Sequence, residues 1–162
     1  MRFIAIILGL TFLISTALIF GPSLLGKSNS GEGGKIVIDP LEYDAGDISI
    51  GGGLLRKTYE IQNAGSGPLK IKNIETSCAC TKAVLRVGDK TSPEFSMPGH
   101  GQNPVVWSTT LAPGQKGELE VIFDPAFHGP DALGPIVRVV YISTDDPQNK
   151  EVQVKLSTNV TR

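Results

Sequence analysis

Short segments that alternate between apolar and polar residues recur along most of the chain. In the clearest of them, Leu119, Val121 and Phe123 share one parity, and two glutamates occupy the other. Because successive side chains of a strand point to opposite faces, this alternation predicts a β-strand with one face toward a core. The same argument predicts strands at 55–62, 69–73 and 151–156, with a bulge or a strand end near Asn73.

Three further segments have strand-like composition, and they are 35–39, 105–111 and 136–143. The last of these is mostly apolar on both faces, which is typical of a central strand. Clusters of Gly, Pro, Asn and Asp separate the segments, and no segment after residue 21 has the period of a helix. About seven strands joined by short turns predict an all-β domain over residues 35–162, an immunoglobulin-like antiparallel β-sandwich.

The chain begins with a long apolar run. Phe3–Phe20 contains no charge and no proline, and Arg2 precedes it. As a helix the run would extend about 27 Å, close to the roughly 30 Å hydrocarbon core of a bilayer. We expect residues 1–21 to be an uncleaved signal anchor, or alternatively a cleaved signal peptide or a buried core helix. Residues 22–34, which are small, polar and rich in glycine, predict a flexible linker.

Both export interpretations place the domain outside the cytoplasm. With an uncleaved helix, the protein is a single-pass protein of the inner or cytoplasmic membrane, and its C-terminal domain is periplasmic or extracellular. With a cleaved helix, the protein is secreted. The formal net charge is only −1, and no basic cluster is present, so nucleic acid is not an expected partner.

The candidate chemistry lies in 68–84, where a predicted strand and a polar turn lead to Cys78 and Cys80 at the expected start of another strand. In an extended strand these two side chains share a face, with Cα atoms about 6.5–7 Å apart. That separation is at or beyond the usual limit for a disulfide, so a bridge would need a bend at Ala79. Three roles stay open for the pair: structural packing, a redox-active or partner-linking dithiol, and part of a soft-metal site.

Three more residues are candidates for such a metal site. Met97, His100 and His128 lie in predicted loops, and thiolate, thioether and imidazole ligands together suit copper(I). The site requires these loops to converge on the cysteines. Taken singly, the histidines are typical solvent-facing loop residues, Met97 is a typical loop-packing residue, and the only tryptophan, Trp107, fits either a core or a binding surface.

Several motifs together resemble the bacterial DUF1573 family. They are the Asn63-Ala64-Gly65 turn followed by Pro68-Leu69, the cysteine motif SCACT at 77–81, and Pro113-Gly114 upstream of Phe123-Asp124. The resemblance covers roughly 36–156 and implies an exported, immunoglobulin-like sandwich related in shape to ASPM/SPD-2/Hydin domains. It implies no enzymatic activity. The sequence departs from the family by a long insertion at Gly88–Pro104.

The sequence contains no phosphate-binding glycine loop, no nucleophile elbow and no zinc-spaced cluster, so it predicts no catalytic residues and no enzyme. Our leading hypothesis is a non-enzymatic, membrane-tethered exported module that binds another cell-envelope protein, for example by strand addition at a sheet edge. The alternative is an exported copper-binding or thiol-redox protein that uses Cys78 and Cys80.

Overall fold

The computed structural model describes residues 33–100, 103–104 and 106–162. The predicted anchor at 1–21 and nearly all of the predicted linker lie outside the described residues. Within the described ranges, no helix is long and apolar enough to cross a membrane. Gly34, which the sequence assigned to the end of the linker, is buried, because its backbone packs directly against Leu69.

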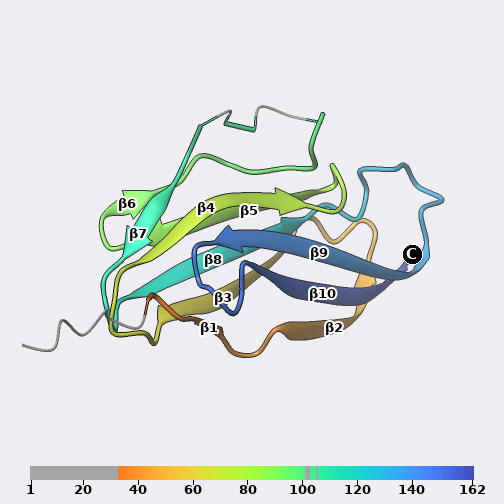
Figure 1. The fold of residues 1–162 in the computed structure, drawn as a ribbon. Helices are drawn as coiled ribbons and strands as arrows, with labels where there is room; N and C mark the ends of the chain where they lie inside the picture. The colour runs from red at the N-terminus through yellow and green to blue at the C-terminus, as the bar shows by residue number, and fades with distance from the viewer. Residues whose placement is uncertain (1–32, 101–102, 105) are drawn as a thin grey trace, which may run out of the picture. The chain divides into compact units, whose positions relative to one another are not determined.

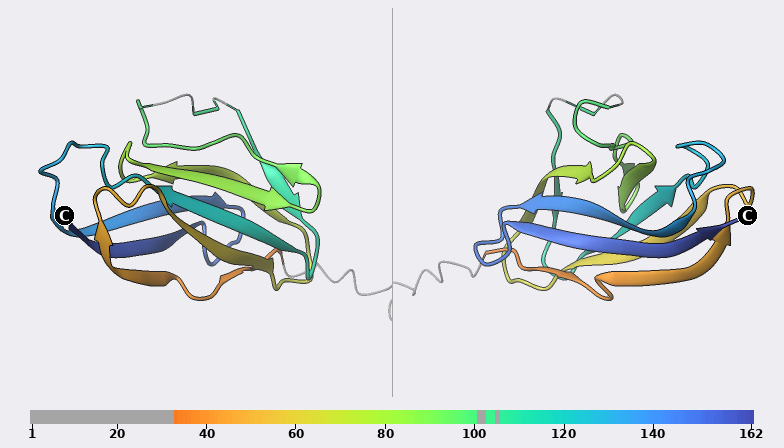
Figure 2. Two further views of the ribbon diagram at one scale, coloured as in Figure 1. Left: turned by 180° about the vertical axis from the view of Figure 1, so that it is seen from behind. Right: turned by 90° about the vertical axis from the view of Figure 1, so that its right-hand side faces the viewer.

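The described residues form two five-stranded sheets, which confirms the all-β prediction (Figure 1). The first sheet has the order β1 (Ile36–Ile38), β3 (Leu55–Asn63), β8 (Lys116–Phe123), β5 (Thr81–Val87), β6 (Lys90–Thr91). The second has the order β2 (Glu42–Ser49), β10 (Glu151–Thr161), β9 (Gly134–Thr144), β4 (Leu69–Thr76), β7 (Thr109–Leu111). The two sheets lie face to face, as the further views in Figure 2 show.

One strand pair differs from the predicted antiparallel arrangement. β2 pairs with β10 in parallel, whereas every other described strand pair is antiparallel. β2 follows β1 after a short connection, in which the chain passes from the first sheet to the second. The purely antiparallel prediction is therefore wrong at this edge.

The alternating residues fill the space between the sheets. Leu119, Val121 and Phe123 are all buried, as predicted. In β4, the register shifts between Ile71 and Asn73, and this bulge is what allows Ile74 to point inward as well. The predicted central strand is also confirmed, because β9 lies between β10 and β4.

The described first part of the insertion at Gly88–Pro104 is more regular than the predicted loop. After the β5–β6 hairpin, the chain runs back beside β5, where Phe95 and Ala83 exchange two backbone hydrogen bonds of 3.0 and 2.8 Å. Phe95 is fully buried, and its ring meets Trp107 edge-on, with centroids 4.9 Å apart. Of the described residues in the predicted strand at 105–111, only Thr109–Leu111 form a strand, β7, and Trp107 lies ahead of it.

Asn63, at the end of β3, is a buried polar residue that joins separate parts of the domain. Its side-chain nitrogen donates to the carbonyls of Gly67 and Leu111, and its side-chain oxygen accepts from the N–H groups of Lys35 and Gly65. Each of these four bonds is 2.8–3.1 Å long. A buried amide with every partner in place stabilises one arrangement of the surrounding turns.

We expect Asn63→Ala to lower the free energy of unfolding by about 2 kcal/mol, because it removes the side-chain partner of four backbone groups, of which the Leu111 carbonyl is buried and the others are partly buried. Urea unfolding followed by circular dichroism measures the change. Asn73→Ala is the matched control, since the Asn73 amide donates only to the Glu75 side chain. Equal losses for the two variants would contradict the structural role of Asn63.

Candidate thiol and imidazole site

Cys78 and Cys80 lie in a turn, and the prediction that they begin a strand is wrong. The turn is closed by a 3.0 Å hydrogen bond from the Thr81 N–H to the Cys78 carbonyl, with Ala79 and Cys80 at its centre. β5 begins only at Thr81. The chain therefore bends at Ala79, as a close approach of the two sulfurs requires, and both thiols are free in this structure.

Both sheets hold this turn, because it carries the chain from β4 in one sheet to β5 in the other. On one side, the Ser77 N–H donates to the Val139 carbonyl (2.9 Å), and the Val139 N–H donates to the Ser77 hydroxyl (3.0 Å). On the other side, the Asp124 N–H donates to the Cys80 carbonyl over 2.9 Å. The turn is thus anchored to β9 and to the end of β8.

A buried hydroxyl completes the support of the turn. Thr76 is the last residue of β4, and its Oγ1 lies 2.9 Å from the Cys78 carbonyl and 3.0 Å from the Thr81 carbonyl. Its single proton is shared between these two acceptors or held by one of them. The hydroxyl therefore holds both ends of the turn together.

His128 comes to the cysteines from the connection between β8 and β9. Its Nε2 lies 3.3 Å from the Cys78 Sγ, and the two sulfurs and a ring nitrogen of His128 all lie within 4.8 Å of one another. The imidazole meets the Phe127 ring edge-on, with centroids 5.1 Å apart. Cys80 is 2% exposed, Cys78 is half-buried and His128 is exposed, so the group runs from the interior to the surface.

Arg138 on β9 is a member of the site that the sequence did not single out. Its Nε donates to the Cys80 Sγ over 3.1 Å, and its guanidinium carbon lies 5.6 Å from the centre of the Phe123 ring. The one feature of the sequence that could have identified Arg138 is its place as the single basic residue in the apolar run IVRVVYIS at 136–143. That run indicated a central strand, and nothing in it pointed to a partner for the arginine.

The surroundings shift the pKa values of the two thiols in opposite directions. Burial by itself raises the pKa of Cys78, but hydrogen bonds with Cys80 and His128, together with the Arg138 charge, lower it overall. Burial and the hydrogen bond with the Cys78 sulfur raise the pKa of Cys80, against the opposing effects of Thr81 and Arg138. The more accessible sulfur is therefore also the one that ionises more readily.

The structure brings together only part of the predicted metal set. Cys78, Cys80 and His128 converge, whereas the exposed His100 is not among the converging ligand atoms. The His100 N–H donates to the Met97 carbonyl in a separate turn. Met97 is half-buried, and the preceding residue, Ser96, accepts a 3.2 Å hydrogen bond from the Thr76 N–H.

A hollow of about 290 Å³ adjoins the thiol turn. Ala79, Cys80 and Ile122 line it, together with Leu54 and Phe127, which are each 51% exposed. Its charged lining residues are Arg56, Lys82, Glu94 and Asp124. Accessible apolar side chains therefore lie in the same hollow as Cys80.

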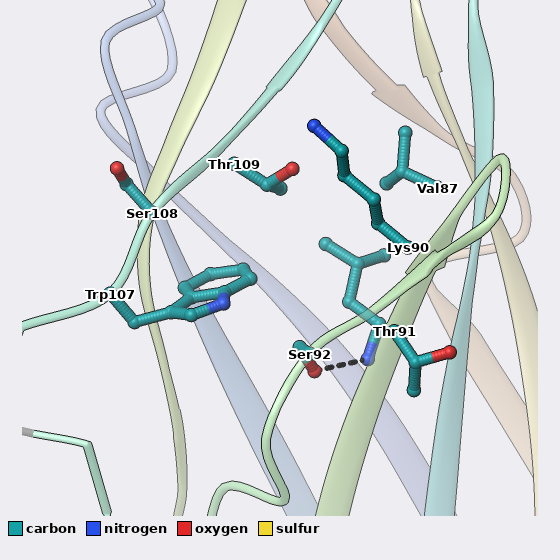
Figure 3. A pocket seen from close by; sticks show the side chains of 8 residues that line it. Val87, Lys90, Thr91, Ser92, Trp107, Ser108 and Thr109 are labelled. Carbon is teal, nitrogen blue, oxygen red and sulfur yellow. Dashed lines mark hydrogen bonds between the residues drawn. The ribbon is translucent and has the colours of Figure 1, made fainter.

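A second hollow of about 290 Å³ lies between the edge strands β6 and β7. Figure 3 shows Trp107 on one side of it and Lys90 on the other, with Thr109 and Val87 nearby. Trp107 both packs on Phe95 and borders this hollow, so it fits neither of the two predicted roles alone.

The family comparison matches one segment of the chain. Residues 36–92 match DUF1573, a family described as proteins of unknown function, which confirms the resemblance inferred from the sequence. The matched segment spans β1–β6 and contains both cysteines, while His128 and Arg138 lie outside it. Comparison with curated protein sequences found no match.

Two solved structures show a similar fold. A protein of unknown function from Porphyromonas gingivalis W83 is 21% identical, with a TM-score of 0.59 over 79% of this chain and 47% of that chain. A family 123 glycoside hydrolase from Clostridium perfringens is 10% identical, with a TM-score of 0.52 over 80% of this chain and 27% of that chain. The chain spans less than half of each, and at these identities the likeness concerns the fold alone.

We expect Cys78 to react with iodoacetamide faster than Cys80 and to reach its maximal rate at a lower pH, because the thiolate is the reactive form. Fragment-ion mass spectrometry separates the two cysteines after alkylation across a pH series. In His128→Ala, the midpoint for Cys78 should move to higher pH, while His100→Ala should leave it unchanged. A Cys78 midpoint at or above that of Cys80 would contradict the described environment.

Proposed function

We propose that this chain, whose DUF1573 segment carries both cysteines, is an exported dithiol module that engages another envelope protein by thiol–disulfide exchange. The observation that supports this proposal is a pair of free thiols in one turn, of which one is accessible and the other is buried behind it. The partner is another envelope protein, as the sequence predicts. Its contact with the chain is assigned to the thiol turn instead of a sheet edge.

Unequal exposure gives the two sulfurs different roles. Cys78 is half-buried and lies beside the exposed His128, so an incoming disulfide meets its sulfur first. Cys80 is 2% exposed and lies within 4.8 Å of that sulfur. Cys78 is therefore the attacking thiol, and Cys80 is the resolving thiol.

The exchange has two steps. The Cys78 thiolate attacks one sulfur of the partner's disulfide, that disulfide breaks, and the partner's other sulfur leaves as a thiolate. Cys80 then gives up its proton and attacks the Cys78 sulfur, which releases the partner's second thiolate and forms a Cys78–Cys80 disulfide. The partner is reduced and the dithiol is oxidised, so each chain reacts once until an external thiol reductant restores it, in keeping with a non-enzymatic module.

The hollow beside the turn supplies the contact for the partner's polypeptide. Leu54 and Phe127 present exposed apolar surface there, and Cys80 forms part of the wall. Apolar side chains that flank the partner's disulfide bury this surface when they bind. The thiols and the docking surface thus lie next to each other.

Trapping with glutathione disulfide tests the exchange on the full chain in mild detergent. We expect Cys80→Ser to accumulate a glutathione adduct on Cys78, because the resolving thiol is absent, and the reduced wild type to proceed to an internal disulfide. Intact-mass spectrometry distinguishes the two products. Cys78→Ser is the matched control and should form at least about tenfold less adduct, since the remaining thiol is buried. Equal adducts in the two variants would refute the assigned roles.

We also propose a location in the cell and a fold type for this protein. The apolar run Phe3–Phe20 is the membrane tether, and the domain that follows is exported and immunoglobulin-like. The two packed sheets and the family resemblance support the immunoglobulin-like fold. We expect an alkaline phosphatase fused after Arg162 to be active in bacteria and to stay in the membrane pellet after alkaline washing. An inactive fusion would rule out export, and release by the wash would rule out the tether.

A further inference from the structure

We propose that Cys78, Cys80 and His128 also bind one soft monovalent metal ion, copper(I), through two thiolates and one imidazole nitrogen. This function goes beyond disulfide exchange, although it uses the same two sulfurs. It starts from the convergence of three potential ligands that two different connections bring to one end of the domain, β4–β5 and β8–β9.

The spacing of the ligand atoms fits a metal ion. Metal–sulfur bonds of about 2.3 Å and metal–nitrogen bonds of about 2.0 Å place neighbouring ligand atoms roughly 3.5–4 Å apart. The Cys78 Sγ and His128 Nε2 are 3.3 Å apart, and the whole group lies within 4.8 Å. Because the widest pair is no more than 4.8 Å apart, side-chain movements of about 1 Å would bring all three ligand atoms to these separations.

The donor types select a soft ion. Two thiolates with one imidazole favour copper(I) or zinc over calcium and magnesium, which prefer oxygen ligands. The converging group contains no carboxylate. Asp124, an acid that lines the adjoining hollow, is not in the group and accepts a hydrogen bond from the Ala126 N–H.

Arg138 distinguishes a monovalent from a divalent ion. Two thiolates and copper(I) carry a net charge of −1, which the guanidinium beside Cys80 balances. With zinc in place of copper(I), the two thiolates, the ion and the guanidinium would together carry +1. This charge would lie next to a largely buried sulfur, where an uncompensated charge is costly. The arginine also donates its hydrogen bond to a ligand sulfur, the kind of outer contact that orients metal ligands.

The number of ligands points to the same ion. A structural zinc site needs four protein ligands, and three converge here. Three soft ligands are sufficient for copper(I). Because His128 is exposed and Cys78 is half-buried, the ion is reachable from solvent, which suits a site that receives and releases its metal.

Anaerobic copper(I) titration against the coloured chelator bathocuproine disulfonate tests the site, with the full reduced chain in mild detergent. We expect wild-type protein to withdraw one equivalent from the chelator. Cys78→Ser and Cys80→Ser should abolish this competition, and His128→Ala should weaken the affinity at least about tenfold. His100→Ala is the matched control and should bind as the wild type does, because its ring lies outside the group.

Several outcomes would overturn the proposal. They are no withdrawal of copper by the wild type, retention of affinity in Cys78→Ser, or equal losses in the two histidine variants. A zinc affinity equal to the copper(I) affinity under the same conditions would overturn the monovalent assignment. Cys78→Ser keeps this test valid even if substitution at the buried Cys80 impairs folding, and circular dichroism identifies such a failure.

The two proposed functions fail separately. His128→Ala retains both thiols, so it should still form the Cys78–Cys80 disulfide with glutathione disulfide while its copper affinity falls. Exchange without copper binding would overturn the metal site alone. Copper binding without any glutathione adduct in Cys80→Ser would overturn the exchange alone.

Discussion

The cysteine turn is fixed because it is hydrogen-bonded to both sheets at once. Ser77 pairs with Val139 in one sheet, and the Cys80 carbonyl accepts from the Asp124 N–H at the end of the other. A change in the spacing of the two sheets would therefore change the turn. The apolar core sets this spacing, so the packing of the sandwich positions the sulfurs, and the core residue Phe123 also lies under the Arg138 guanidinium.

The site draws its electrostatic character from the same placement. Cys80 faces Arg138 of β9 on the interior side, whereas Cys78 faces His128 on the solvent side. Identical side chains two positions apart thus acquire different pKa values and different accessibility. Such a difference needs a turn that directs one sulfur inward and the other outward, and an extended strand would have placed both on one face.

The sequence predicted the strands well where burial is one-sided, because inward-facing residues such as Leu119 then recur with period two. It misplaced the cysteines because SCACT carries no alternation that separates a turn from a strand. The ligand chemistry of His128 made it a candidate partner of the two cysteines. The sequence could not show that it lies beside them, because this depends on how the β8–β9 connection packs. Arg138 was missed because its partner is distant in sequence. The packing of the insertion through Phe95 was not predicted either, since a single aromatic residue among polar ones shows no period.

The two proposed activities, metal binding and disulfide exchange, would compete for the same lone pairs on the same sulfurs. A copper ion held by both thiolates removes the attacking and the resolving group together, and an internal disulfide removes two of the three ligands. In these two proposals, the redox state of the dithiol determines whether the domain can hold metal, and bound metal protects the dithiol from oxidation. In these proposals His128 serves the metal as a ligand but serves the exchange only through the lowered pKa of Cys78, so its loss would weaken metal binding more than exchange. A chain with the cysteines alone would retain exchange and lose most of the protection.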